Sequence, residues 1–473
     1  MTKPFIPRGR FQTEATQFLL RNPRANLHVD MGLGKTIMVL NAIDSLIIAG
    51  ELNPVLVVAP LRVATNTWSD EIAKWDHLSY LRVSPIVGDK EKRGDALRKE
   101  ADIYTINFEN LPWLVDELKD SWPFRTIVID ESTRLKSHRS HFRAKKGGTA
   151  TLVCTSGVRS SAIARLSFTK TLRFWNLTGT PAANGLYDLW GQQFFIDKGE
   201  ALGRSFSAFE QRWFRKDFKG YSLELLPGAE ARIRAAIAST TFTLRAEDYL
   251  VMGEEITNDI FVTMPERARK LYDEMEKNLY IEIKAGEVEA FTAATKSTKI
   301  HQIANGAIYY DKQGSWELIH DAKIDALQSV IEEAGGMPVI VVYQFKSDLV
   351  RLRKAFPKGR AFDTKPETER DFKAGKIPVL FLHPASGGHG SDGFQHVTNQ
   401  ICFFSLDWNG ENRIQSIARI GKVRQLQAGF DRPVFIHQII CRDTIDEDIL
   451  ERIKSKKTIA DALKDGLARR NLK

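Results

Sequence analysis

The sequence predicts an α/β protein with two parallel-sheet domains and a helical region between them. Short apolar runs alternate with amphipathic stretches of helix length in both halves of the chain. Because these runs are apolar at consecutive positions, we expect strands buried on both faces, as in a parallel sheet covered by helices. A charged, mostly helical stretch with few such runs, residues 202–323, separates the halves. We therefore expect a first domain at 1–240, a helical insert at 241–322 and a second domain at 323–473.

The expected strands of the two sheets are the apolar runs themselves. In the first half they lie at residues 26–29, 55–58, 103–106, 126–129 and 174–177. In the second half they lie at residues 339–342, 379–382, 401–404 and 434–436.

The composition indicates a globular protein with a basic character. The chain has 473 residues, of which 43% are hydrophobic and 27% are charged, and its formal net charge is +9. A basic excess favours a polyanionic partner. The three cysteines lie far apart and make no disulfide framework, and no run of apolar residues is long enough to predict a membrane span. We expect a cytoplasmic monomer without a membrane anchor.

A glycine loop between the run at 26–29 and an amphipathic helix pattern is typical of a phosphate-binding site. Its residues are Gly32, Leu33, Gly34, Lys35 and Thr36. Glycines allow backbone N–H groups to converge on phosphate oxygens, and the N-terminus of the following helix adds a favourable dipole. In such a loop Lys35 reaches the β- and γ-phosphates and Thr36 ligates Mg²⁺. The general pattern has one more glycine, at the position of Val29.

Two carboxylates follow a later buried run. Asp130 and Glu131 come directly after residues 126–129, so they belong at the carboxyl edge of the expected sheet, where such folds bind ligands. We expect Asp130 to hold Mg²⁺ and Glu131 to polarise the attacking water. An Asp-Glu pair after a strand often only caps a helix, but its place downstream of a phosphate loop favours nucleotide hydrolysis.

The order of these motifs resembles that of the Swi/Snf-type ATPases of helicase superfamily two. The phosphate loop of that family is the variant found here, which accounts for the missing glycine. Further similar segments are Phe11-Gln12 with Glu14, Val57–Leu61, Asp130-Glu131-Ser132, and Leu177–Pro181 with Trp190. Ser132 stands where the family more often has alanine or cysteine. The resemblance implies two RecA-like domains, ATP and Mg²⁺ as cofactors, and double-stranded DNA as the partner.

The second half carries the remaining family-like segments. Gln344-Phe345 resembles the opening motif of the second motor domain, and Pro384–Gly390 resembles its glycine-rich ATP-sensing loop. Asp407-Trp408-Asn409 resembles a segment whose Trp offers a stacking or wedge surface. Residues 442–457 resemble a C-terminal helix that braces the two motor domains, although a solvated terminal helix fits the same pattern.

The last motif of the family supplies arginines to the γ-phosphate, and Arg419 matches the first of them. The position of the second holds Lys422, and Arg424 lies two residues later. Lysine lacks the planar fork of arginine and replaces it imperfectly. The second arginine finger is therefore either Lys422 or Arg424.

The resemblance assigns roles to individual residues. Catalysis falls to Lys35, Asp130, Glu131 and Arg419, and metal binding to Thr36 and Asp130. Nucleotide binding falls to Gln12, Gly32, Leu33, Gly34, Lys35, Thr36, Gly390, Arg419 and Lys422. Contacts to nucleic acid fall to Pro60, Arg62, Asn107, Thr178, Thr180, Gln344, Ser386 and Trp408.

A basic segment, residues 136–173, separates the Asp-Glu pair from the Thr-Gly-Thr-Pro motif. It holds nine Lys and Arg residues and neither Asp nor Glu. We expect a long, flexible loop that contacts phosphates in a salt-sensitive, sequence-independent way. His138, His141 and Cys154 lie in this segment, but a single cysteine without paired ligands does not predict a zinc site.

Together these features predict an ATP-dependent translocase that moves on duplex DNA. One alternative is an RNA helicase or a strand-separating DNA helicase. Another is a nucleotide-dependent, nucleic-acid-binding scaffold with weak catalysis, which Lys422 and Pro384 favour because the family usually has Arg and Ser or Thr at these positions. The compact length suits a phage or mobile-element protein, which would act in the host cytoplasm.

Overall fold

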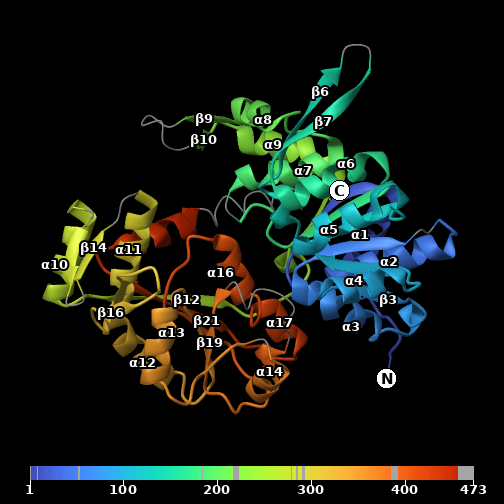
Figure 1. Cartoon of the computed structure of the whole chain (residues 1–473). Coiled ribbons are helices and arrows are strands. Elements are labelled where there is room, and N and C mark those ends of the chain that lie inside the picture. Colours follow the sequence, from blue (N-terminus) through green and yellow to red (C-terminus); the bar gives the residue numbers. More distant parts are fainter. Residues whose placement is uncertain are drawn as a thin grey trace. The chain divides into compact units, whose positions relative to one another are not determined.

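The computed structural model of the chain describes residues 2–7, 9–51, 54–145, 148–183, 185–216, 223–278, 280–283, 286–289, 293–363, 365–384 and 393–455. These residues form two compact units, here unit 1 and unit 2, which adjoin in the sequence between Leu250 and Val251 (Figure 1). The junction differs from the predicted boundaries at 240 and 322, because the strands on either side of it complete the main sheets.

Unit 1 is built around a seven-stranded sheet in which every neighbouring pair of strands is parallel. The order of the strands is β11 (Thr241–Leu244), β1 (Arg24–Val29), β8 (Arg173–Thr178), β5 (Thr126–Asp130), β2 (Val55–Ala59), β4 (Ile103–Asn107) and β3 (Val83–Ile86). The five strands predicted in the first half are all present.

The helices that accompany this sheet alternate with its strands along the chain. They are α1 (Arg10–Arg21), α2 (Lys35–Ile48), α3 (Trp68–Ile72), α4 (Lys90–Arg98), α5 (Leu111–Leu118), α6 (Val158–Thr169) and α7 (Leu189–Asp197), followed by α8 (Phe206–Trp213) and α9 (Ala229–Ile237). Trp68, Trp175 and Trp190 are among the largest fully buried side chains, so the core of unit 1 is closely packed.

Residues 136–173 are not the flexible loop that we predicted. Strands β6 (Arg139–Lys145) and β7 (Gly148–Ser156) form an antiparallel hairpin, which extends away from the sheet (Figure 1). Phe142 and Leu152 face each other across the two strands and pack against a buried cluster of unit 1. This cross-strand pair stabilises the hairpin, and the high content of Lys, Arg, Ser and Thr hid it in the sequence.

Unit 2 contains a second sheet, with six strands and parallel neighbours throughout. The order of its strands is β12 (Glu255–Val262), β21 (Val434–Cys441), β20 (Gln400–Phe403), β17 (Val339–Val342), β19 (Val379–Leu382) and β18 (Arg360–Ala361). In the central strand, Ile340 and Val342 pack in one buried cluster and Val339 and Val341 in another. Burial on both faces explains why this run is apolar throughout. The two parallel sheets confirm the predicted fold class of two RecA-like α/β domains.

The helices of unit 2 are α10 (Glu266–Asn278), α11 (Ala293–Asn305), α12 (Ala322–Glu333), α13 (Lys346–Ala355), α14 (Pro366–Lys373), α16 (Gly410–Ile417) and α17 (Lys422–Gln427). Residues 445–455 are also helical, at the place of the predicted brace helix, whose last two residues lie outside the described part. In that part of the chain, none of the helices is long and apolar enough to cross a membrane.

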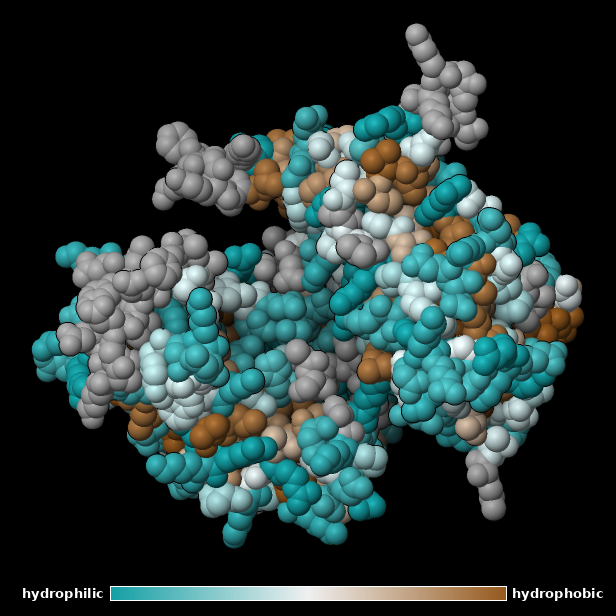
Figure 2. Space-filling view, viewed as in Figure 1, coloured by the Kyte–Doolittle hydropathy of each residue, from teal (hydrophilic) through white to brown (hydrophobic). Residues whose placement is uncertain are grey.

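The stretch at 202–323 is less helical than predicted. Besides β11 and β12 it contains three antiparallel hairpins, formed by β9 (Phe214–Lys216) with β10 (Leu223–Leu225), β13 (Tyr280–Ile283) with β14 (Gly286–Glu289), and β15 (Ala307–Tyr309) with β16 (Trp316–Leu318). Strand β12 is only partly buried, and the buried edge strand β11 alternates threonine with apolar residues, so neither has a continuous apolar run. Figure 2 shows mostly hydrophilic side chains on the visible face of both units, with hydrophobic ones in separate small patches.

Candidate functional site

The carboxyl ends of the strands bring most of the predicted residues of unit 1 to one edge of the sheet. Parallel strands all end at the same edge, and there such sheets bind ligands. The phosphate loop follows β1, Pro60 and Arg62 follow β2, Asn107 ends β4, Asp130 ends β5 and Thr178 ends β8. The site therefore arises from segments that lie far apart in the sequence.

The phosphate loop has the backbone geometry that its glycines allow. Gly32 and Gly34 have φ angles of 86° and 89°, in the left-handed region that other residues rarely adopt. Lys35 begins α2, and its Nζ donates a 2.8 Å hydrogen bond to the carbonyl oxygen of Val29. Because Val29 contributes only its backbone carbonyl to this bond, the bond itself needs no glycine there.

Helix α1 places Gln12 directly against the phosphate loop. Gln12 is buried, and its Nε2 donates a 3.0 Å hydrogen bond to the carbonyl oxygen of Leu33. One turn later, the hydroxyl of Thr16 donates to the carbonyl oxygen of Met38 on α2. A Cβ atom on Gly34 would lie 2.8 Å from Gln12 Nε2, so the loop and Gln12 fit closely. The role of Gln12 in binding adenine stays a prediction.

The loop is held by the strands on both sides of β1. The backbone N–H of Asp30 donates to Leu244 O at 3.1 Å, and the carboxylate of Asp30 accepts from the N–H of Ala246 at 3.0 Å. From the other side, a Cβ atom on Gly179 would lie 3.4 Å from Lys35 Nζ. The Thr-Gly-Thr-Pro motif thus closely approaches the lysine of the loop.

Asp130 is a buried carboxylate within electrostatic reach of Lys35. Only 8% of its surface is exposed, and Trp68 Nε1 donates a 3.2 Å hydrogen bond to its Oδ2. Burial raises the pKa of Asp130, whereas the charge of Lys35 and the hydrogen bond from Trp68 lower it. An ammonium group within electrostatic reach of a carboxylate provides one group for phosphate and one for a metal ion.

Glu131 has a strained backbone. Its φ and ψ angles are 62° and 61°, in the left-handed region. Such a conformation costs a residue other than glycine about 1–3 kcal/mol and is found most often at functional sites. The observed strain is consistent with a position whose geometry matters for chemistry.

A buried polar link joins the Asp-Glu pair to the Thr-Gly-Thr-Pro motif. The hydroxyl of Ser132 donates to Gln192 Oε1 on α7 at 2.8 Å. In turn, Gln192 Nε2 donates to Pro181 O at 2.8 Å and to Asp188 O at 3.0 Å. Ser132 and Gln192 are 0% and 2% exposed. The two loops at the sheet edge are therefore connected by the side chain of one residue, which our sequence analysis did not select.

Replacing Gln192 by leucine is expected to lower the free energy of unfolding by about 1–3 kcal/mol, because Ser132 and two carbonyl groups lose a buried partner. The double variant Ser132→Ala/Gln192→Leu is expected to be less destabilised than the sum of the single variants, by about 1 kcal/mol. Urea unfolding of the full chain measures both quantities. The exposed Gln17→Leu on α1 is a matched control, and a Gln192→Leu variant as stable as this control would contradict the prediction.

Three further residues of unit 1 that are predicted to contact nucleic acid form hydrogen bonds within their own loops. Asn107 donates from Nδ2 to Glu109 Oε2 at 2.9 Å and accepts at Oδ1 from Asn110. Thr178 Oγ1 accepts from the N–H of Thr180 at 3.0 Å, and both threonines are buried. Their contact with nucleic acid stays a prediction.

His138 is a structural residue of unit 1. Its Nδ1 and Nε2 share hydrogen bonds with Ser160 and Ser140 at 3.0 and 2.8 Å. Burial lowers the pKa of His138 to about 4, so the ring is neutral near pH 7. Among the residues that the structure describes, no group of three or more His, Cys, Asp and Glu side chains could hold a metal ion.

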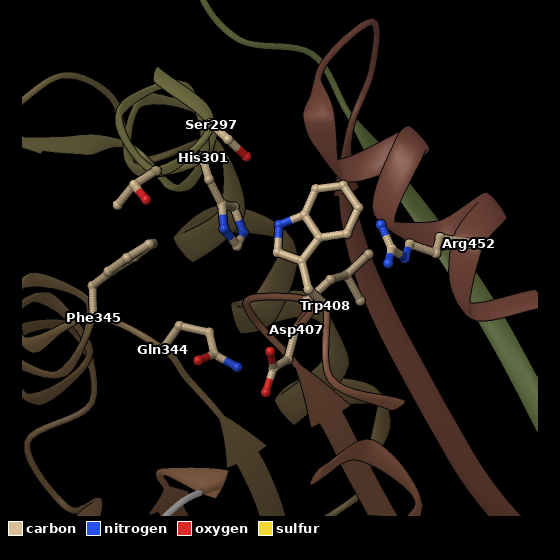
Figure 3. Close-up of a pocket in the computed structure, with 9 residues that line it drawn as sticks. Ser297, His301, Gln344, Phe345, Asp407, Trp408 and Arg452 are labelled. Carbon is tan, nitrogen blue, oxygen red and sulfur yellow. The ribbon is translucent and has the colours of Figure 1, made fainter. Parts of the chain in front are cut away.

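In unit 2, the structure brings Gln344 and Trp408 together. They follow the adjacent strands β17 and β20 and line one pocket with a volume of about 540 Å³ (Figure 3). His301 on α11 and Arg452 in the helix at 445–455 line the same pocket, although nothing in their sequence context had marked them. Only the fold places these distant segments side by side.

The arginine motif lies in the turn between α16 and α17 and at the start of α17. Arg419 is 4% exposed, and its guanidinium carbon lies 5.8 Å from the centre of the Phe394 ring. Lys422 is the first residue of α17, and Arg424 follows in the same helix. The predicted contacts Ser386 and Gly390 lie outside the described residues.

A lysine in a phosphate loop that faces a buried carboxylate is the arrangement of nucleotide hydrolysis, and two parallel α/β units in one chain are the architecture of helicase motors. The chain is accordingly an ATP-hydrolysing enzyme of the helicase type. Within this class its family can be named. The family model of the SNF2-related domain matches residues 12–318, so the chain belongs to the SNF2-related family. This result confirms the family that the motifs predicted.

Several known proteins are similar to this chain. Protein p41 of Acyrthosiphon pisum secondary endosymbiont phage 1 is 47% identical over 99% of the chain and 100% of its own length. An uncharacterized ATP-dependent helicase of Mycoplasma pneumoniae is 25% identical over 89% of the chain. The DNA repair and recombination protein RDH54 of Saccharomyces cerevisiae (strain S288c) is 24% identical over 91% of the chain. The chain spans only 38% and 48% of the length of these two relatives.

A solved structure, the Sulfolobus solfataricus SWI2/SNF2 ATPase core in complex with dsDNA, is 19% identical to the chain. It covers 99% of this chain and 96% of its own, with a TM-score of 0.44.

Proposed function

We propose that this protein is an ATP-dependent translocase that moves on duplex DNA. The observation that carries the proposal is the arrangement of Lys35, Asp130 and Glu131 at one sheet edge, in a chain of the SNF2-related family. In this proposal Lys35 binds the β- and γ-phosphates of ATP, and Glu131 orients the attacking water.

The phosphate loop and the Asp-Glu pair contain side chains that are suitable ligands for Mg²⁺. Thr36 on the first turn of α2 and Asp130 at the end of β5 offer a hydroxyl and a carboxylate, the oxygen donors that this ion prefers. When bound, Mg²⁺ would neutralise charge that develops on the phosphates. A nearby cation would also favour the charged form of Asp130, against the effect of its burial.

Lys35 exchanges its partner in the cycle that we propose. Its bond to the carbonyl of Val29 is replaced by bonds to phosphate when ATP binds, and is restored when the phosphate leaves. Gln12, already bonded to the loop at Leu33, adds a contact to the adenine. Arg419 supplies positive charge to the γ-phosphate during hydrolysis. Each cycle advances the protein along one strand of the duplex.

The charge of the chain supports DNA as the partner. The net charge is +9, and the segment at 136–173 holds nine basic residues without an acidic one. Most of its first half forms the hairpin β6–β7, on which Arg143 is exposed. Basic side chains on a projecting hairpin suit phosphate contacts, whose strength falls steeply with salt.

Duplex DNA is expected to stimulate ATP hydrolysis by the full chain more than single-stranded DNA or RNA does. The steady-state rate of ATP hydrolysis is measured with the three nucleic acids at matched phosphate concentration and salt. A strand-displacement assay on the same preparations shows whether movement separates the strands. A higher rate with RNA or with single-stranded DNA would contradict the proposal, and tight binding of ATP and DNA without turnover would indicate a scaffold.

A further inference from the structure

A second basic part of unit 1 is formed by α8, β9, β10 and α9, residues 202–237, here the α8–α9 module. This segment has seven Lys and Arg residues and four Asp and Glu residues. Helices α8 and α9 lie beside the base of the hairpin β6–β7 (Figure 1). Phe142 and Leu152 of that hairpin pack against the buried cluster to which Phe209 and Trp213 of α8 belong. The module and the hairpin are therefore one packed part of unit 1.

Two arginines of the module lie over the same tryptophan. Trp213 is the last residue of α8 and is 2% exposed. Its ring centre lies 4.6 Å from the guanidinium carbon of Arg212 and 5.7 Å from that of Arg232 on α9. The indole Nε1 donates a 2.7 Å hydrogen bond to the carbonyl oxygen of Leu202, which fixes the ring. Both arginines are exposed, and their cation–π contacts hold the two guanidinium groups at the surface.

The described carboxylates of the module are used by other side chains. Glu224 and Glu230 form ion pairs with Arg215 and Arg234, at 3.2 and 2.9 Å. Glu210 accepts a hydrogen bond from a tyrosine hydroxyl. Two of the arginines of the module are thus neutralised within it, and the pair over the tryptophan is not.

Arg212 and Arg232 form no ion pair with any residue that the structure describes. Arg212 Nη1 donates a 3.4 Å hydrogen bond to the carbonyl oxygen of Ala201. Arg232 donates two, from Nε to Gly228 O and from Nη2 to Pro227 O, each at 3.4 Å. A guanidinium group has five N–H donors, so both arginines keep donors for a ligand. Because carbonyl oxygens do not neutralise a guanidinium, the site also keeps its positive charge.

This arrangement suits the phosphate group. A guanidinium that lies over an aromatic ring can still direct its planar N–H edge outward, and that fork matches phosphate oxygens in a bidentate geometry. The site adjoins the hairpin, because the guanidinium carbon of Arg139 on β6 lies 3.3 Å from the ring centre of Phe206 on α8. The proposed function assigns the basic residues of that hairpin to DNA phosphates. The neighbouring site therefore favours a DNA phosphate over a carboxylate of an acidic protein.

We propose that Arg212 and Arg232 bind phosphate groups of the duplex on which the protein moves. The two guanidinium groups, held over Trp213, donate hydrogen bonds to phosphate oxygens. The site belongs to α8 and α9 and not to the loops at the carboxyl edge of the main sheet, so it adds a separate contact to the DNA backbone. The contact is independent of sequence, because phosphates carry no sequence information. The inference rests on the duplex-DNA partner of the proposed function.

The test measures the affinity of the full chain for a DNA duplex over a range of salt concentrations. The wild type is compared with the double variant Arg212→Ala/Arg232→Ala. We expect the variant to bind roughly tenfold more weakly at a given salt concentration, the loss that one or two charge-assisted hydrogen bonds would give. The slope of log affinity against log salt is expected to be less steep by about one to two, because fewer counterions are released. Two duplexes of unrelated sequence are expected to show the same loss.

Two further variants separate a phosphate contact from other effects of charge. Arg98→Ala removes an exposed, ion-paired arginine at the end of α4 and changes the net charge of the chain per site in the same way. We expect this control to keep the wild-type slope. Arg212→Lys/Arg232→Lys keeps both charges but lacks the planar fork, so it is expected to keep most of the slope and to lose part of the affinity.

Wild-type affinity and slope in the alanine double variant would overturn the proposal, and an acidic protein would then be the partner to test. A loss of affinity without a change of slope would also overturn it, because the arginines would then act only through the packing of the module. Thermal melting shows whether each variant is folded. If the alanine variant is not, Arg212→Gln/Arg232→Gln, which keeps part of each side-chain stem, is measured in its place.

Stimulation of ATP hydrolysis by the same duplex is measured for the wild type in parallel. If the duplex neither binds to the wild type nor stimulates it, the proposed function fails. If it does both while the alanine double variant binds like the wild type, only the arginine site fails.

Discussion

Replacing Lys35 by alanine is expected to reduce DNA-stimulated ATP turnover by a factor on the order of 10²–10³, the usual loss when one pre-organised charged donor at a transition state is removed. Lys35 Nζ lies at the loop, bonded to Val29 O at 2.8 Å, and its charge acts on Asp130. The variant loses the ammonium group that would stabilise charge on the phosphates, and Asp130 loses the cation that lowers its pKa. Turnover at saturating ATP and DNA measures the effect.

The control for this variant is Lys90→Ala. Lys90 is the first residue of α4, as Lys35 is of α2, but it is exposed and follows β3, the edge strand that four other strands separate from β1. We expect this control to keep wild-type turnover. A Lys35→Ala variant that is folded by circular dichroism and keeps more than about a tenth of wild-type turnover would contradict the assignment of the phosphate loop.

Replacing Arg419 by alanine is expected to lower turnover by a factor on the order of 10³–10⁵, the range measured for arginine fingers. Arg419 is 4% exposed, and its guanidinium lies over the ring of Phe394. Arg419→Lys is expected to recover little activity, because lysine keeps the charge but lacks the planar fork. Turnover and the KM for ATP are measured together, since a finger that acts in the transition state lowers kcat more than it changes KM.

A matched variant separates chemistry from packing. Arg432 lies over Phe430, with its guanidinium carbon 4.2 Å from the ring centre, so Arg432→Ala removes a similar contact in unit 2. Turnover in Arg419→Ala that is no lower than in Arg432→Ala would show that Arg419 only packs. Lys422→Ala and Arg424→Ala, measured alongside, identify the second finger as the residue whose loss lowers turnover more.

The central parts of both sheets could be predicted from the sequence. A strand covered by helices on both faces must be apolar at successive positions. This pattern is present in runs such as 339–342 and 379–382. The edge strands β11 and β12 and the hairpin β6–β7 were not predicted. Their stability depends on partners far away in the chain, and one side of each remains polar or exposed.

The residues of the candidate site likewise fall into two groups, those that the sequence could identify and those that it could not. The phosphate loop and the Asp-Glu pair could be selected because each consists of adjacent residues whose types suit one chemistry. Gln192 could not be selected, because its role consists of contacts to Ser132 and Pro181, 60 and 11 residues away. A glutamine inside a helix carries no sign of such contacts.

The sequence by itself determined which residues could carry phosphate chemistry and to which family the chain belongs, because loops that bind phosphate need particular residues at adjacent positions. The tertiary structure alone decided which of these residues meet. Parallel strands bring their carboxyl ends to one edge, so Lys35 lies within electrostatic reach of Asp130, 95 positions later in the sequence. In unit 2, His301, Trp408 and Arg452 line one pocket. Contacts of this kind depend on packing between distant segments, which no local pattern records.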